Sequence, residues 1–233
     1  EVVEADRGFE ATRLRYLHFG NMEGSLRCST QLAVSAGIRG DAEAAGKALQ
    51  SVYDVARAYD LRPAIGEALL VHARLVRMAG DLDKAMRLLH DALDIFTHKS
   101  TGTGWIELLL EIAVIYELNE EFELAEQRTT EALLLARQTG HKIFEAYATI
   151  QLSDLVLRRA SELDARAHCM RIEEAVETLS SGRYLLHWRA SAIQRAANAL
   201  ARVGKPDLAN QYIKESARLG KRLGAEHLYP DSI

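Results

Sequence analysis

Residues 64–96 of the chain read AIGEALLVHARLVRMAGDLDKAMRLLHDALDIF, two apolar-striped segments on either side of Gly80 and Asp81. In the first segment, apolar side chains recur at steps of three and four residues, which is the pattern of an amphipathic helix. Gly favours the position just after a helix, and Asp caps the helix that follows. The second segment carries the same stripe from Leu82 to Phe96. The stretch therefore predicts two antiparallel helices joined by a short turn.

The pattern recurs along the chain with a spacing of 40 residues. Alanine stands at each of five positions with this spacing: Ala5, Ala45, Ala85, Ala125 and Ala165. Twelve positions before the last four of them stand the small residues Ala33, Ala73, Ala113 and Ser153, and a further copy around Ala197 and Ala209 follows after a spacing of 44. Self-similarity at a period of roughly 20–50 residues is typical of stacked repeat proteins. Small residues at fixed positions let the helix backbones approach closely.

We therefore predict an all-α solenoid of antiparallel helix pairs with about eleven helices. A single repeat domain is expected over residues 1–222, in which residues 1–20 form the second helix of a truncated repeat. The five complete pairs are expected at residues 23–60, 63–99, 103–139, 142–180 and 183–222, and residues 223–233 are expected to be a tail or linker. The four extra residues before Ala209 add about one helical turn, so the apolar face is preserved. We interpret the chain as a piece of a longer protein, with any output domain outside it.

The repeated positions resemble those of tetratricopeptide repeats. Such units have a small residue in the first helix, then alanine, an aromatic residue or leucine, and alanine along the second. The matching sets are Ala33/Ala45/Leu49/Val52, Ala73/Ala85/Leu89/Ala92, Ala113/Ala125/Thr129/Ala132 and Ala197/Ala209/Ile213/Ser216. The resemblance covers essentially the whole chain, but the spacing is 40 residues instead of about 34, and the closing proline is absent. It implies a right-handed superhelix, and units of this length resemble those of bacterial signalling regulators.

The resemblance also implies that the first helix of each pair lines a concave groove. The groove-facing residues would then be Arg27, Gln31, Glu67, Arg74, Arg77, Glu107, Glu111, Glu117, Tyr147, Gln151, Asp154, Arg158, Arg195, Asn198 and Arg202. Their charges predict an acidic middle flanked by basic units. Such a surface suits a peptide with a basic centre, or another helix of the same protein. The alternative is that these residues form the ordinary solvated faces of amphipathic helices.

Composition and motifs argue against several other classes of protein. The net charge is -4 with both signs interspersed, which does not favour nucleic acid as a partner. No apolar run approaches the roughly 20 residues of a membrane span. Cys28 and Cys169 are isolated, without metal-ligand spacing, as expected in a reducing cytoplasm. Gly46 and Lys47 lack the surroundings of a phosphate loop. We therefore predict no enzyme activity, no metal site and no cofactor.

Two functions remain open at this point. The leading hypothesis is a non-catalytic protein- or peptide-binding module, the sensory or docking part of a larger bacterial signalling or regulatory protein. The alternative is an oligomerisation or spacer scaffold for an attached enzyme, such as a nucleotide cyclase, or for a DNA-binding output domain. Phe9 and Leu17 leave an apolar end without a preceding helix, and this end would allow self-association.

Overall fold

The computed structural model describes residues 2–96, 103–158, 162–181 and 185–231. These residues form eleven α-helices and one short 3-10 helix, without a β-strand. In chain order they are α1 (Val2–His18), α2 (Met22–Ile38), α3 (Ala42–Ala58), α4 (Arg62–Met78), α5 (Leu82–Leu93), α6 (Gly104–Leu118), α7 (Phe122–Thr139), α8 (Lys142–Leu157), α9 (Glu162–Ser181), α10 (Leu186–Arg202), α11 (Pro206–Leu223) and η1 (Glu226–Leu228). The all-α class and the number of helices are confirmed. The boundaries expected at residues 99 and 183 lie outside the described residues.

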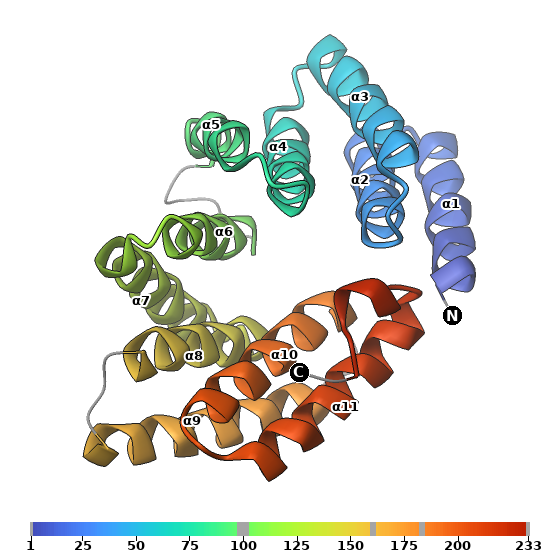
Figure 1. Ribbon diagram of the computed structural model, residues 1–233. Helices are drawn as coiled ribbons and strands as arrows, with labels where there is room; N and C mark the ends of the chain where they lie inside the picture. Colours follow the sequence, from blue (N-terminus) through green and yellow to red (C-terminus); the bar gives the residue numbers. More distant parts are fainter. Residues whose placement is uncertain (1, 97–102, 159–161, 182–184, 232–233) are drawn as a thin grey trace. The chain divides into compact units, whose positions relative to one another are not determined.

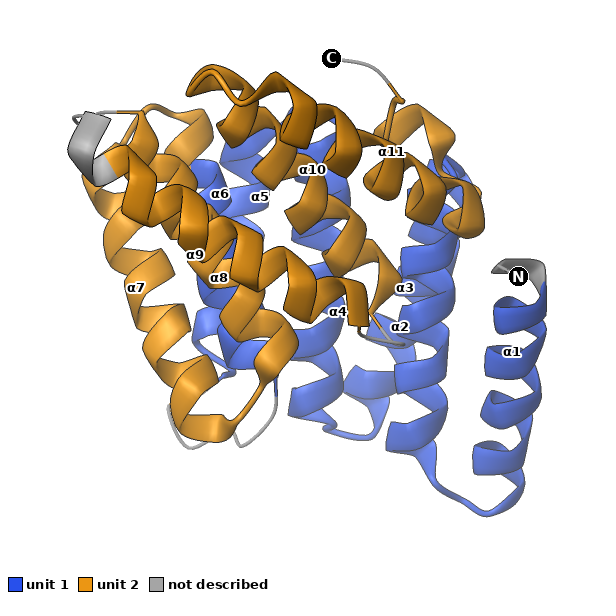
Figure 2. Ribbon diagram, turned by 90° about the horizontal axis from the view of Figure 1, so that it is seen from below, with its two compact units in different colours: residues 1–115 blue, residues 116–233 orange. Residues whose placement is uncertain are grey.

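The chain divides into two compact units, residues 1–115 and residues 116–233 (Figure 2). In the first unit each helix from α1 to α4 packs on the next one, and α2 also contacts α4 (Figure 1). In the second unit α8 packs on α7 and α9, and α10 packs on α8, α9 and α11. The first helices of successive pairs therefore touch within each unit, which is how neighbouring repeats share a core. The organisation of residues 1–222 as one continuous array stays a prediction.

One kind of turn joins most of the helices, and it contains a residue in the left-handed region of backbone space. Residues with positive φ stand at Gly20, Gly40, Asp60, Gly80, Glu120, Gly140 and Gly204. In each turn the next N–H reaches back to a carbonyl of the last helical turn, as from Asn21 to Tyr16 at 2.8 Å. Gly adopts positive φ without the steric cost of a Cβ atom. The same turn occurs within pairs and between pairs. Up to residue 80, a new helix therefore begins about every 20 residues.

Side-chain caps begin several of the helices. Asp41 accepts a hydrogen bond from the N–H of Ala44, and Asp81 accepts one from the N–H of Lys84, both at 3.0 Å. These bonds satisfy amide groups that have no partner inside the helix. The cap predicted at Asp81 is confirmed.

The repeated small residues form the contact points of the core. Ala33, Ala45, Ala85 and Ala125 are each 0% exposed. Because their side chains end at Cβ, the backbones of neighbouring helices come close together, and dispersion contacts are dense there. The first alanine of the series is different: Ala5 on α1 is exposed, because α1 packs chiefly against α2 and its opposite face is open.

The segment after α11 folds back on the second unit. Tyr229 is 5% exposed, and its hydroxyl lies 2.8 Å from Nδ1 of His187 on α10. A Cβ atom on Gly220 would lie 2.8 Å from Cβ of Tyr229, so this glycine makes room for the tyrosine. Residues 225–229 therefore belong to the packed structure of the second unit, although the sequence suggests a tail or linker.

Candidate functional site

The fifteen residues predicted to face a groove all lie on, or directly after, the first helices of the pairs. Arg27 and Gln31 lie on α2, and Glu67, Arg74 and Arg77 lie on α4. The others are Glu107, Glu111 and Glu117 on α6, Tyr147, Gln151 and Asp154 on α8 with Arg158 directly after it, and Arg195, Asn198 and Arg202 on α10. Arg27 and Gln31 are exposed, and Arg27 lies 3.3 Å from Glu67 and 3.2 Å from Glu23.

In the first unit, four of these residues form a buried ionic cluster, which we call the Arg74 cluster: Arg74, Arg77, Glu107 and Glu111. Nε of Arg74 donates to Glu111 at 2.6 Å, and Nε of Arg77 donates to the other oxygen of Glu111 at 3.0 Å. Nη2 of Arg74 also reaches Glu107 at 3.3 Å. The side chains of Arg74 and Glu111 are each 6% exposed. These residues join α4 to α6 and are not a free binding surface.

The acidic middle expected from the sequence is therefore not an open acidic face. Glu107 and Glu111 follow one another by one helical turn and would repel if unpaired. Arg74 and Arg77 neutralise them from the neighbouring helix. A peptide with a basic centre would have to displace these two arginines, so the ion pairs do not favour such a peptide at this place.

The environment of the Arg74 cluster shifts the pKa values of its two carboxyl groups in opposite directions. Burial by itself would raise the pKa of Glu111, but Arg77 and Arg74 outweigh it and lower this pKa to about 2. At Glu107, burial outweighs the effect of Arg74, and the pKa is raised. Glu111 is therefore the carboxylate that holds the two arginines in place.

Glu111 should make the stability of the first unit depend on pH. Its folded-state pKa lies below the ordinary value of 4.5, so its charge stabilises the fold above pH 4.5, and this contribution is lost as the pH falls toward 2. Glu107 has a raised pKa, so its charge destabilises the fold at higher pH, and this cost is removed as the pH falls. Between pH 4.5 and pH 2, we expect the free energy of unfolding to fall by about 3 kcal/mol more in wild type than in Glu111→Gln. Urea unfolding at a series of pH values measures the difference, and parallel curves would contradict the assignment.

In the second unit, six of the predicted residues line one open cleft of about 270 Å³, which we call the arginine cleft. The six are Glu117, Asp154, Arg158, Arg195, Asn198 and Arg202. The remaining lining residues are Ser191, Gln194, Leu228 and Tyr229. The cleft thus combines residues from the end of α6, from α8, from α10 and from the segment after α11.

Three arginines share two carboxylates in this cleft. Arg195 lies 2.6 Å from Glu117 and 3.1 Å from Asp154. Arg158 reaches Glu117 at 2.7 Å, and Arg202 pairs with the buried carboxylate of Asp154. These three arginines and two carboxylates carry a formal net charge of +1. Burial would lower the pKa of Arg195, but Glu117 and Tyr147 outweigh this effect and raise it. The guanidinium group of Arg195 therefore stays charged.

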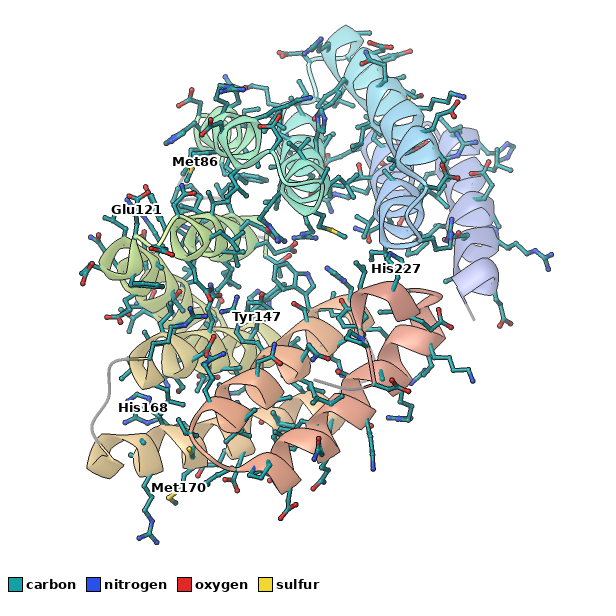
Figure 3. All side chains as sticks on the ribbon, in the orientation of Figure 1. Met86, Glu121, Tyr147, His168, Met170 and His227 are labelled. Atoms are coloured by element: carbon teal, nitrogen blue, oxygen red, sulfur yellow. The ribbon has the colours of Figure 1, made fainter. Side chains whose placement is uncertain are left out.

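The face of α8 that carries Asp154 also holds a buried amide without a partner. Gln151 is 0% exposed, and neither its amide nitrogen nor its amide oxygen has a hydrogen-bond partner among the residues that the structure describes. Tyr147, labelled in Figure 3, precedes it by four residues on the same face of α8. An unpartnered buried amide is costly in a helix-packing core, where most polar groups are paired. Gln151 and Asp154 are thus two buried polar side chains on one face of α8.

The segment after α11 was not assigned to a site from the sequence. Leu228 and Tyr229 nevertheless line the arginine cleft. A signal was present in Gly220, since a glycine in the interior of a helix weakens it unless another group must approach closely. Which group approaches Gly220 depends on how the chain turns at Gly224, and a helical pattern contains no information about this.

Metal-ligating side chains are scattered over the described residues. Nowhere in them do three or more His, Cys, Asp or Glu side chains gather in a way that could hold a metal ion. None of the described helices is both long enough and apolar enough to cross a membrane.

The comparisons with known proteins concern the fold. No protein-family model and no curated protein sequence matches the chain. The crystal structure of BtubC (BKLC) from P. vanneervenii is similar with a TM-score of 0.63 and 18% identity, over 96% of this chain and 91% of that one. The kinesin light chain TPR-like repeats from Podosopora anserina are similar with a TM-score of 0.54 and 18% identity, over 84% of this chain and 95% of that one. The chain thus has the fold of a TPR-like helical repeat protein.

Proposed function

We propose that the chain is a non-catalytic module that binds a protein or peptide, as the sensory or docking part of a larger bacterial signalling or regulatory protein in the cytoplasm. The arginine cleft is the observation that carries this proposal. The length of the repeat resembles that of bacterial regulators, and this supports a role in a bacterial signalling or regulatory protein. The two buried, unpaired cysteines agree with a reducing compartment.

The chemistry of the cleft favours an acidic segment of the partner. Its charged residues leave one positive charge in excess, and Arg202 keeps 44% of its side chain exposed. A guanidinium group has five N–H donors in a planar fork, so donors remain beyond those that face Asp154. Asn198 is exposed on the same helix and offers an amide. A volume of about 270 Å³ accommodates one or two side chains of a bound segment, with the rest of the partner lying outside.

The proposal is tested with labelled peptides by fluorescence anisotropy. The probes are a Glu-rich peptide and a Lys-rich peptide of the same length, measured at low and high salt. We expect the Glu-rich peptide to bind more tightly and more salt-dependently, and Arg202→Glu to weaken its binding by roughly tenfold or more. The matched control is Arg87→Glu on α5, an exposed position outside the cleft. Equal affinity for both peptides, or equal loss in both variants, would refute an anionic ligand in the cleft.

A further inference from the structure

Gln151 on α8 carries a hydrogen-bond donor and an acceptor that the described part of the chain leaves unused. The residue is 0% exposed, and neither atom of its amide has a partner there. Of the described residues, Gln151 alone combines an unpaired buried donor with an unpaired buried acceptor. Such groups lower stability unless a partner satisfies them. An amide in this state suits a ligand that offers an acceptor and a donor side by side.

The contacts of Arg195 place Gln151 beneath the arginine cleft. Tyr147 and Asp154 are seven residues apart on α8, about two helical turns, and Gln151 stands between them on the same face. The guanidinium group of Arg195 reaches both of these neighbours. It lies 3.1 Å from Asp154, and the hydroxyl of Tyr147 accepts a hydrogen bond from it. Arg195 therefore spans the position of Gln151 and separates its amide from the open cleft.

The two carboxylates of the cleft do not depend on Arg195 alone. Glu117 also pairs with Arg158 at 2.7 Å, and Asp154 also pairs with Arg202. When the carboxylate of a bound partner takes Arg195, Glu117 and Asp154 thus each keep one arginine. A carboxylate left buried without a partner would be strongly destabilising, and this second set of ion pairs avoids it. Arg195 can therefore turn toward a ligand and uncover Gln151.

An extended peptide chain matches the amide that becomes uncovered. In an extended segment, the N–H and the C=O of one residue point to the same side, as they do when strands pair. The carboxamide of Gln presents an NH2 donor and a carbonyl acceptor in one plane, so it can bond both groups of a single residue. An acidic side chain on the same segment supplies the carboxylate that takes Arg195.

We propose that Gln151 is a closed subsite of the arginine cleft that binds the main chain of an extended acidic peptide, with Arg195 as its cover. The inference rests on the proposed function, since it concerns how the same cleft recognises its ligand. The charged residues of the cleft select an acidic segment, and Gln151 fixes the position of its main chain.

Gln151→Met separates this role from a structural one, because the two roles give opposite results. Met has nearly the volume of Gln, so it fills the site and leaves no amide unpaired. The variant should raise the urea midpoint of unfolding. It should nevertheless weaken binding of the Glu-rich peptide about tenfold, because two hydrogen bonds to the main chain are lost. The matched control Gln127→Met, at an exposed position of α7 outside the cleft, should change neither quantity.

Backbone-methylated probes test whether the hydrogen bonds go to the main chain. The probe is a short alanine peptide with a single central Glu, so that its register is fixed, and each version carries one N-methyl group that removes one N–H. At one position the methyl group should weaken binding to wild type about fivefold, measured by fluorescence anisotropy. The same methyl group should have no effect on binding to Gln151→Met. Equal effects on both proteins at every position would overturn the proposal.

Failure of this inference and failure of the proposed function give different results. If only the Glu-rich peptide binds, and Gln151→Met binds it as wild type does, the subsite is refuted and the anionic cleft is kept. If the Glu-rich and Lys-rich peptides bind equally and Gln151→Met weakens both, the preference for acidic segments is refuted and the main-chain role of Gln151 is supported. A wild type that binds none of the peptides refutes both.

Discussion

Glu111→Ala is expected to lower the free energy of unfolding of residues 1–115 by about 3–5 kcal/mol. Glu111 accepts hydrogen bonds from Arg74 and Arg77, and the side chain of Arg74 is only 6% exposed. Without the carboxylate, Arg74 keeps a buried positive charge but loses its shortest ionic contact, since the contact to Glu107 is longer. A buried charge that has lost its main partner cannot regain the solvation that it had in the unfolded chain, and this accounts for the size of the effect.

Urea unfolding, followed by circular dichroism, measures this loss, and hydrogen exchange on α4 and α6 locates it. The control Glu43→Ala removes an exposed carboxylate that pairs with the exposed Lys47, and it should change the stability by less than about 0.5 kcal/mol. The double variant Arg74→Met/Glu111→Met should regain part of the stability, because it removes the buried charge of Arg74 together with its main partner. Arg77 and Glu107 remain, but their side chains are 20% and 21% exposed and keep some contact with water. If Glu111→Ala behaved like the exposed control, the cluster would not be buried in solution.

Trp188→Ala is expected to lower the free energy of unfolding of the second unit by about 3–5 kcal/mol. Trp188 on α10 is 6% exposed and meets the rings of Phe144 and Tyr147 on α8 edge to face, with centroids 5.3 and 4.9 Å away. Truncation removes this apolar contact and leaves a cavity between the two first helices of successive pairs.

The matched control is Tyr59→Ala, which removes an aromatic side chain that is 62% exposed and should have a small effect. Hydrogen exchange should show faster exchange in α8 and α10 for Trp188→Ala, whereas the first unit should be affected little. If protection in α8 and α10 were unchanged, the aromatic contact would not hold these helices together. Most residues of the arginine cleft lie on or next to α8 and α10, so peptide binding should weaken in parallel with the protection of these helices.

The helices and their turns were largely predictable from local sequence. Gly40 and Gly80 mark turns, and Asp81 marks the start of α5, because backbone conformation at these positions is a property of the residue itself. The turn at Glu120 has the same left-handed backbone, with φ of 62°, without a glycine. There the sequence signal was only the position in the repeat. The burial of Ala45 and Ala85 likewise followed from their spacing, since each recurs on the same face of a helix.

The candidate site was predictable only in part. Six of the fifteen residues placed on one groove by the repeat register line the arginine cleft, including Asp154 and Arg195. Register could identify the helix face, but it could not distinguish a buried ion pair from an exposed charge. Arg74 and Glu111 are therefore structural partners within the first unit. The contribution of Tyr229 also escaped prediction, because the repeat pattern ends before it.

Local sequence and tertiary packing act over different ranges along the chain. The sequence alone was sufficient for the all-α class, the number of helices and the small residues at their contacts, because helix periodicity and turn preferences act over a few residues. The tertiary structure decided which charges meet, since the partners are far apart in the chain: 37 residues separate Arg74 from Glu111, and 78 separate Arg195 from Glu117. Such pairs form only when helices from different repeats pack together. Packing also decides whether a charge is desolvated, and this determines if it stabilises the fold or remains available to bind a partner.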